Sequence, residues 1–146
     1  MGPRFANRGT RTFSDEATFV AFAAAFARQL RPGDVVALSG PLGSGKTTFV
    51  RAVVRALHGA DRTSSPTFTF WHRYPGSPPI DHLDLYRIED ARETAELGLE
   101  EAFDGSSIAL IEWPEKAPHL VTGPRYDVQI DGAGEAPRNV TIQGPA

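Results

Sequence analysis

Residues 40–47, Gly-Pro-Leu-Gly-Ser-Gly-Lys-Thr, fit the phosphate-loop pattern G-x-x-x-x-G-K-[ST]. Glycines in such a loop let backbone N–H groups turn inward onto phosphate oxygens, and the helix that follows points its positive end at the same anion. The lysine of the pattern neutralises the β- and γ-phosphate oxygens, and the next hydroxyl binds Mg²⁺. The pattern therefore predicts nucleotide binding by Gly40, Gly43, Ser44, Gly45, Lys46, Thr47 and Thr48.

Two acidic residues are candidates for the metal and for catalysis, because a phosphate loop also needs a carboxylate and a group that places water. Glu112 ends the apolar run 108–111, and the carboxyl ends of strands border the ligand crevice in open α/β sheets. Asp84 lies inside His-Leu-Asp-Leu-Tyr-Arg at 82–87. The alternatives are a solvated strand-end glutamate and an aspartate paired with Arg87. The residues leave open which acid binds the metal and which positions water.

For His82 and Asp81, which precede Asp84 in the chain, the sequence predicts different roles. His82 precedes it by two residues, so both share a strand face and His82 is a candidate to orient that acid. Asp81 is out of phase with Asp84 and is expected at the surface. The remaining histidines show no metal-ligand spacing.

The elements that must position these groups follow from hydrophobic spacing and turn residues. Residues 1–12 look like a loose lead-in, and Ser14 is a plausible N-cap for a helix that runs to about Leu30. The spacing then predicts a buried strand at 34–39, a helix at 46–57, strands at 67–74 and 80–86, a broken helical segment at 88–103, a buried strand at 107–111 and a hairpin built on 126–130 and 140–142. We expect a single α/β domain over 1–146, with a mostly parallel sheet and an antiparallel excursion.

Composition narrows the functional classes. The chain has 15 basic and 18 acidic residues, a net charge of −3 with neutral histidine, and no cysteine. This balance argues against a protein that holds nucleic acid by its own charge. The lack of cysteine excludes a zinc–thiolate site and a cysteine nucleophile, and it fits a reducing compartment such as the cytoplasm. No apolar stretch is long enough to span a membrane, and Asp15 and Glu16 before the run 19–27 argue against a signal peptide.

Several motifs in order resemble the TsaE (YjeE) family, the bacterial ATPase of tRNA threonylcarbamoyladenosine biosynthesis. The resemblance covers about residues 13–118. Beyond the phosphate loop, it rests on Ser-Pro-Thr-Phe-Thr at 65–69, His-Leu-Asp-Leu-Tyr-Arg at 82–87, Glu-Leu-Gly-Leu-Glu-Glu at 96–101 and Ile-Glu-Trp-Pro-Glu at 111–115. Pro41 departs from the family, which usually has a polar residue there.

The resemblance implies a three-layer P-loop NTPase-like domain and a set of roles. Glu112 resembles a Walker-B-like acid that reaches Mg²⁺, with Trp113 beside the site, and residues 65–67 resemble a first switch segment whose Thr67 lies near the γ-phosphate. Asp84 belongs to a second such segment. Adenine would lie against residues 15–18, and Arg138 is a weaker candidate for nucleotide contact.

The resemblance also implies a helper ATPase that docks on the TsaB–TsaD pair, with tRNA contacted only indirectly. ATP is favoured over GTP, since guanine specificity usually needs an Asn-Lys-x-Asp element that the chain lacks. A small-molecule kinase is the alternative enzyme, although no arginine-bearing lid is evident. A nucleotide-gated binding module without hydrolysis is the non-enzymatic alternative.

Overall fold

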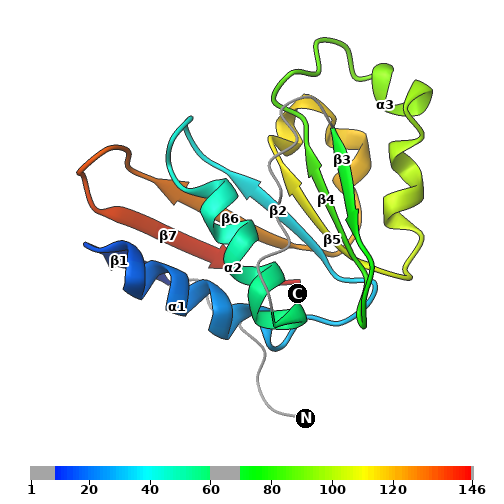
Figure 1. Cartoon of the computed structure of the whole chain (residues 1–146). Coiled ribbons are helices and arrows are strands. Elements are labelled where there is room, and N and C mark those ends of the chain that lie inside the picture. Colours follow the sequence, from blue (N-terminus) through cyan, green and yellow to red (C-terminus); the bar gives the residue numbers. More distant parts are fainter. Residues whose placement is uncertain (1–8, 60–69, 146) are drawn as a thin grey trace.

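The computed structural model describes residues 9–59 and 70–145, which form a seven-stranded sheet with helices on both faces (Figure 1). The order of strands is β1-β7-β6-β2-β5-β4-β3. The strands are β1 (Thr10–Phe13), β2 (Val35–Ser39), β3 (Trp71–Tyr74), β4 (Ile80–Asp84), β5 (Ile108–Glu112), β6 (Tyr126–Asp131) and β7 (Arg138–Gln143). The helices are α1 (Glu16–Ala27), α2 (Lys46–His58), α3 (Glu93–Glu96) and the 3-10 helices η1 (Leu99–Phe103), η2 (Pro114–Lys116) and η3 (Pro118–Val121).

The centre of the sheet is parallel and its margins are antiparallel. β2 pairs in parallel with β5 and β6, and β5 pairs in parallel with β4. The pairs β3–β4, β6–β7 and β1–β7 are antiparallel. This confirms the α/β fold with an antiparallel excursion and a C-terminal hairpin. The register also sets Leu38 and Asp84 on either side of Glu112, so the carboxyl ends of three strands meet at one edge.

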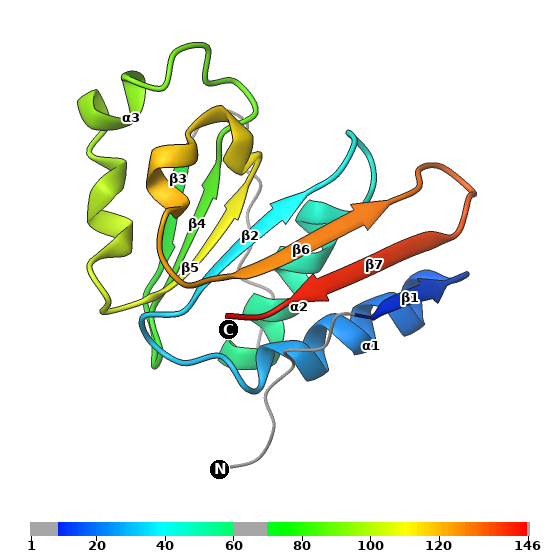
Figure 2. The ribbon, with the colours of Figure 1, turned by 180° about the vertical axis from the view of Figure 1, so that it is seen from behind.

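Successive side chains of the parallel strands point to opposite faces of the sheet and pack into two apolar clusters, one on each face. Val36 and Leu38 pack with α1 and α2, whereas Ala37 packs with residues of the η1–η3 region. Figure 1 shows α1 and α2 on one face, and Figure 2, from behind, shows the shorter helical segments over β4 and β5. The two layers of helix on one sheet give the expected three-layer domain.

Helix α2 illustrates how local sequence sets an element. Its buried face comprises Phe49, Val50, Val53 and neighbours, and Gly59 ends it in the left-handed conformation with its N–H donating to the Arg55 carbonyl. The helix begins at Lys46 directly after the glycine-rich loop. The predicted segment 46–57 is thus confirmed to within one residue.

The N-terminal region differs from the prediction. Thr10–Phe13 is a strand, β1, paired with β7, although residues 1–12 were expected to be loose. The N-cap of α1 is Asp15, not Ser14, because the Asp15 carboxylate accepts the Thr18 backbone N–H at 2.8 Å. The helix ends at Ala27, short of Leu30. Residues 65–67 lie outside the described residues, as do 1–8.

Among the residues that the structure describes, no helix is both long and apolar enough to cross a bilayer.

Candidate nucleotide-binding site

The phosphate loop joins β2 to α2, and two of its glycines have steric reasons to be glycine. Gly40 has φ +148°, and a Cβ there would lie 2.0 Å from the Ile130 carbonyl oxygen. Gly45, the N-cap of α2, has φ +110°, and a Cβ there would press on the Phe19 ring at 3.3 Å. The loop therefore passes close to both β6 and α1, and its positive φ angles are those that glycine permits.

Lys46 is turned back onto its own loop. Its Nζ donates to the carbonyl oxygens of Gly40 at 2.6 Å and Pro41 at 3.0 Å, and it lies 4.3 Å from the centroid of the Trp113 ring. Burial lowers the pKa of Lys46 from its ordinary value, although nearby Glu112, Glu115 and Asp84 oppose that shift. The ammonium is thus held by two carbonyl oxygens of the loop, and phosphate oxygens could replace these contacts.

Trp113 follows Glu112, and its ring lies against the Lys46 ammonium. It has φ +59° and is the one non-glycine residue with positive φ in the described part of the chain. Its ring also packs against Tyr86, with centroids 5.1 Å apart. A strained backbone of this kind costs about 1–3 kcal/mol and is found where geometry matters for function. Trp113 therefore lies beside Lys46 of the phosphate loop.

Glu112 lies against the start of α2. The Thr47 hydroxyl is 3.2 Å from Glu112 Oε1 and 3.3 Å from Oε2, and only 3% of the Glu112 residue surface is exposed. The structure thus brings the predicted hydroxyl and one predicted acid together, across 65 residues of sequence.

His82 contacts Glu112, not Asp84. Its Nε2 lies 2.6 Å from Glu112 Oε2, so the expectation that His82 orients Asp84 is wrong. The reason lies in the register, which sets β4 beside β5 and places the glutamate within reach of the imidazole. Spacing along the sequence relates residues of the same strand only, so it suggested Asp84, the acid two residues from His82, and not Glu112 on β5.

Asp84 ends β4 at the same edge of the sheet. Burial, and then the neighbouring Glu112 carboxylate, raise the pKa of Asp84 above its ordinary value. Its Oδ1 accepts the Tyr86 backbone N–H at 3.1 Å. Both predicted acids therefore lie near the phosphate loop, and Glu112 is the one in contact with Thr47.

A pocket of about 420 Å³ opens beside the loop. Its wall includes the start of α1, the loop residues Gly45 and Thr48, and the β6–β7 turn. Asp15 and Arg138, both predicted near the nucleotide, line it with Phe19 and Gly134. The Arg138 guanidinium donates to the Ala136 and Gly134 carbonyls and so braces the turn. The weakly predicted Arg138 thus lies at the same pocket as residues 15–16.

The residues present fit a bound nucleotide and Mg²⁺. Among the described residues, no side chain caps the N-terminus of α2, and the fully buried Ser44 Oγ has no hydrogen-bond partner. Within that same part of the chain, no three His, Asp or Glu side chains converge on one metal position. Mg²⁺ commonly takes one or two protein ligands together with phosphate oxygens and water, and Thr47 with Glu112 matches that requirement.

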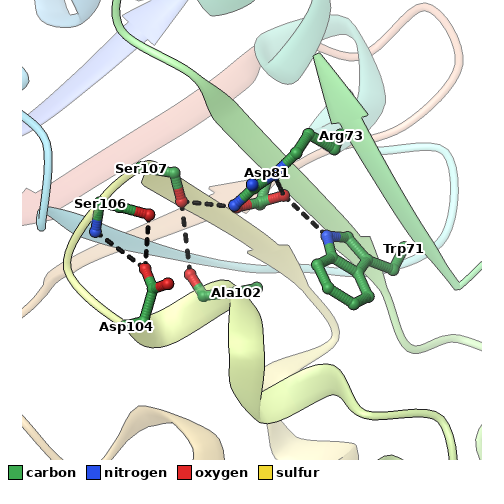
Figure 3. Close-up of polar contacts among 7 residues, drawn as sticks. All are labelled: Trp71, Arg73, Asp81, Ala102, Asp104, Ser106 and Ser107. Atoms are coloured by element: carbon green, nitrogen blue, oxygen red, sulfur yellow. Dashed lines mark hydrogen bonds and ion pairs between the residues drawn. The ribbon is translucent and has the colours of Figure 1, made fainter. Parts of the chain in front are cut away.

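A second polar cluster surrounds Asp81, away from the phosphate loop (Figure 3). Asp81 is fully buried, which corrects the expectation that it lies at the surface. Its Oδ1 accepts hydrogen bonds from Trp71 Nε1 and Arg73 Nε, each at 2.8 Å. Its Oδ2 accepts hydrogen bonds from Arg73 Nη2 at 2.8 Å and from Ser107 Oγ at 2.5 Å. Burial alone would raise the pKa of Asp81, but the hydrogen bonds from Arg73, Ser107 and Trp71 outweigh it and hold the pKa low.

Some contributors were not predicted from the sequence. Phe19 packs on the loop glycine, and Phe13 and Glu135 line the pocket. Their only sequence signal was position near a helix start or a turn. Thr67, predicted near the γ-phosphate, lies outside the described residues.

Comparison with known proteins adds a family assignment to this geometry. The family model described as "Threonylcarbamoyl adenosine biosynthesis protein TsaE" matches residues 13–140. A protein of Bacillus subtilis named tRNA threonylcarbamoyladenosine biosynthesis protein TsaE is 39% identical over 135 residues, covering 90% of this chain and 82% of that protein. A Haemophilus influenzae protein of the same name is 33% identical over 139 residues, covering 91% of this chain and 87% of its own length.

The fold is matched by a solved structure. The crystal structure of YdiB from Bacillus subtilis superposes with a TM-score of 0.78 and 28% sequence identity, covering 99% of this chain and 90% of YdiB. The match spans both the sheet and the helical layers described above.

Proposed function

The chain belongs to the TsaE family of threonylcarbamoyl adenosine biosynthesis proteins, and we propose that it acts there as a helper protein that binds and hydrolyses ATP. Its role is in the synthesis of threonylcarbamoyladenosine in tRNA. The observation that carries the ATPase proposal is the contact between Thr47 and Glu112, which joins the end of the phosphate loop to a buried carboxylate. This is the arrangement that phosphate-loop enzymes use for a nucleotide-bound metal.

Each group has a role in the proposed site. The loop N–H groups and the start of α2 would hold phosphate, and Lys46 would leave its loop carbonyls for the β- and γ-oxygens. Thr47 and Glu112 would hold Mg²⁺, which supplies charge neutralisation during phosphoryl transfer. Asp84, whose pKa is raised by burial and by Glu112, would accept a hydrogen bond from the attacking water.

ATP is the proposed nucleotide, with the base in the pocket beside α1. The chain has no Asn-Lys-x-Asp element for guanine, and the pocket lined by Phe13, Phe19 and Arg138 offers apolar walls and polar groups together. These features support an adenine nucleotide whose base lies near Asp15.

The proposed partner is the TsaB–TsaD pair, and hydrolysis is proposed to depend on it. Arg138, the arginine that lines the base pocket in the described part of the chain, donates to carbonyls of its own turn, so it is not arranged as an arginine finger for the γ-phosphate. Phosphate-loop enzymes without an arginine finger in cis are slow alone and gain about 10³-fold or more from one in trans. The isolated chain is therefore expected to bind ATP and turn it over slowly.

The test is phosphate release at equal ATP, with and without the TsaB–TsaD pair. We expect the pair to raise the rate at least about tenfold. Lys46→Ala should weaken ATP binding about tenfold to a hundredfold, because a hydrogen bond to a charged group is worth about 1.5–3 kcal/mol. Thr67→Ala should bind ATP and lose the stimulation. A fast isolated enzyme that ignores both partners and phosphorylates a metabolite would support the kinase alternative instead.

A further inference from the structure

Within residues 9–59 and 70–145, two side chains form hydrogen bonds with the Glu112 carboxylate, and one of them belongs to the phosphate loop. Thr47 approaches from α2, and His82 approaches from β4 with Nε2 2.6 Å from Oε2. The Glu112 side chain is 3% exposed and that of His82 is 15% exposed. The contact therefore lies largely out of solvent, where a hydrogen bond determines the orientation of a carboxylate more strongly than at the surface.

The chemistry of the pair fixes the direction of this hydrogen bond. A carboxylate that holds a metal ion is ionised and only accepts hydrogen bonds, so in the metal-binding form Nε2–H of His82 is the donor and Oε2 the acceptor. No lysine or arginine is paired with Glu112 in the described residues, since Lys46 donates to Gly40 and Pro41. The imidazole is thus the nitrogen donor that satisfies the buried glutamate and restricts its rotation.

We propose that His82 is a positioning residue for the metal-binding carboxylate. Its N–H holds Glu112 against Thr47, so that hydroxyl and carboxylate are already arranged when Mg²⁺ arrives with the nucleotide. The inference rests on the proposed role of Glu112 in holding Mg²⁺. Carboxylate ligands are commonly oriented by such outer hydrogen bonds, and loss of one typically costs about 10–100-fold in metal affinity.

The side chain of His72 provides a matched control. His72 lies directly opposite His82 in the β3–β4 register, and its ring packs against Tyr74 with centroids 4.4 Å apart. Directly opposed residues of an antiparallel pair share a face of the sheet. A change at His72 therefore perturbs the same patch of sheet without touching Glu112.

The experiment measures Mn²⁺ binding to the ADP-loaded protein by electron paramagnetic resonance. His82→Leu should weaken Mn²⁺ affinity about 10–100-fold, while metal-free ADP affinity changes less than about threefold. His82→Gln places an amide N–H the same number of bonds from Cα, so it should restore Mn²⁺ affinity to within about threefold. His82→Asn is one bond shorter and should behave like the leucine variant. His72→Leu should match the wild type.

Two further variants separate this inference from the proposed function. Glu112→Gln should weaken Mn²⁺ binding itself, and adding His82→Leu to it should cause no further loss. If Glu112→Gln weakens Mn²⁺ binding while His82→Leu and His82→Asn bind Mn²⁺ as the wild type does, the positioning role is overturned and the metal role of Glu112 stands. Wild-type Mn²⁺ affinity in Glu112→Gln would overturn the metal role and the inference together. Loss in His82→Leu without rescue in His82→Gln, despite an unchanged melting temperature, would also contradict the positioning role.

Discussion

Strand β4 contains two aspartates with contrasting surroundings. Asp81 is fully buried and accepts hydrogen bonds from Trp71, Arg73 and Ser107, which hold its pKa low. Asp84, at the end of the same strand, accepts a backbone N–H and lies near Glu112, and its pKa is raised. The first carboxylate is saturated with donors and ties β3 to the loop before β5. The second keeps acceptor capacity beside the phosphate loop, as a residue that works on a ligand must.

The contrast predicts that the two aspartates differ in what they stabilise. Asp81→Ala should lower the free energy of unfolding by about 3 kcal/mol, near the low end for a broken buried ion pair because Arg73 can turn to solvent. Urea unfolding monitored by circular dichroism measures this loss. The exposed pair Asp90–Arg92 is the control, and Arg92→Ala, which leaves Asp90 bonded to the backbone N–H of residue 92, should unfold at the wild-type midpoint.

The pH dependence of stability extends this prediction. Because the folded pKa of Asp81 lies below its unfolded value, its contribution is present above the unfolded pKa and is lost as pH falls through the folded pKa. Asp81→Asn should therefore lose part of the acid sensitivity of the wild type. Unchanged unfolding of both Asp81 variants at neutral pH would contradict the structural role of this cluster.

The next effect is expected at Glu112 and concerns turnover. Glu112→Gln keeps the shape of the side chain and removes its charge, so ATP hydrolysis should fall at least about tenfold, equivalent to about 1.4 kcal/mol in the barrier. The Mg²⁺ concentration needed for half-maximal rate should rise. Phosphate-release assays over a Mg²⁺ series measure both changes. Wild-type turnover in this variant would remove Glu112 from the proposed machinery.

The smallest effect is expected at Asp84 and has the opposite sign in stability. The pKa of Asp84 is higher in the folded state than in the unfolded state, so its ionised form destabilises the fold. This loss of stability develops as pH rises through the folded pKa. Asp84→Asn should therefore melt about 2–4 °C higher at pH 7 and show no gain near pH 3, while hydrolysis falls. A lower melting temperature at pH 7 would mean that Asp84 is a structural residue like Asp81.

The sequence predicted much of this molecule where the signals are local. The phosphate loop, the helix after it and the strand ending in Glu112 were predicted from glycine spacing and apolar runs, and the structure has them. Strand β1 was missed because its partner, β7, is distant in the chain, with Thr10 and Thr141 separated by 131 positions. A short Thr- and Arg-containing segment has no apolar run to mark it as a strand.

For the candidate site, the sequence predicted which residues take part but not which of them contact one another. Lys46, Thr47, Asp84 and Glu112 lie around one point, as expected from the strand ends. The partner of His82 and the burial of Asp81 depend on which strands are neighbours, and spacing along one strand contains no such information. Pairing across the sheet therefore decided both corrections.

The pairing of β1 with β7 has a consequence for how the protein is made. The pocket beside the phosphate loop takes its walls from residues 13–19 and from 134–138, so one side is synthesised well before the other. While the β6–β7 turn is still inside the ribosome, a nascent chain has its phosphate loop but no enclosed pocket. The stabilisation that a nucleotide base gains from this pocket therefore begins once the hairpin has emerged and paired with β1.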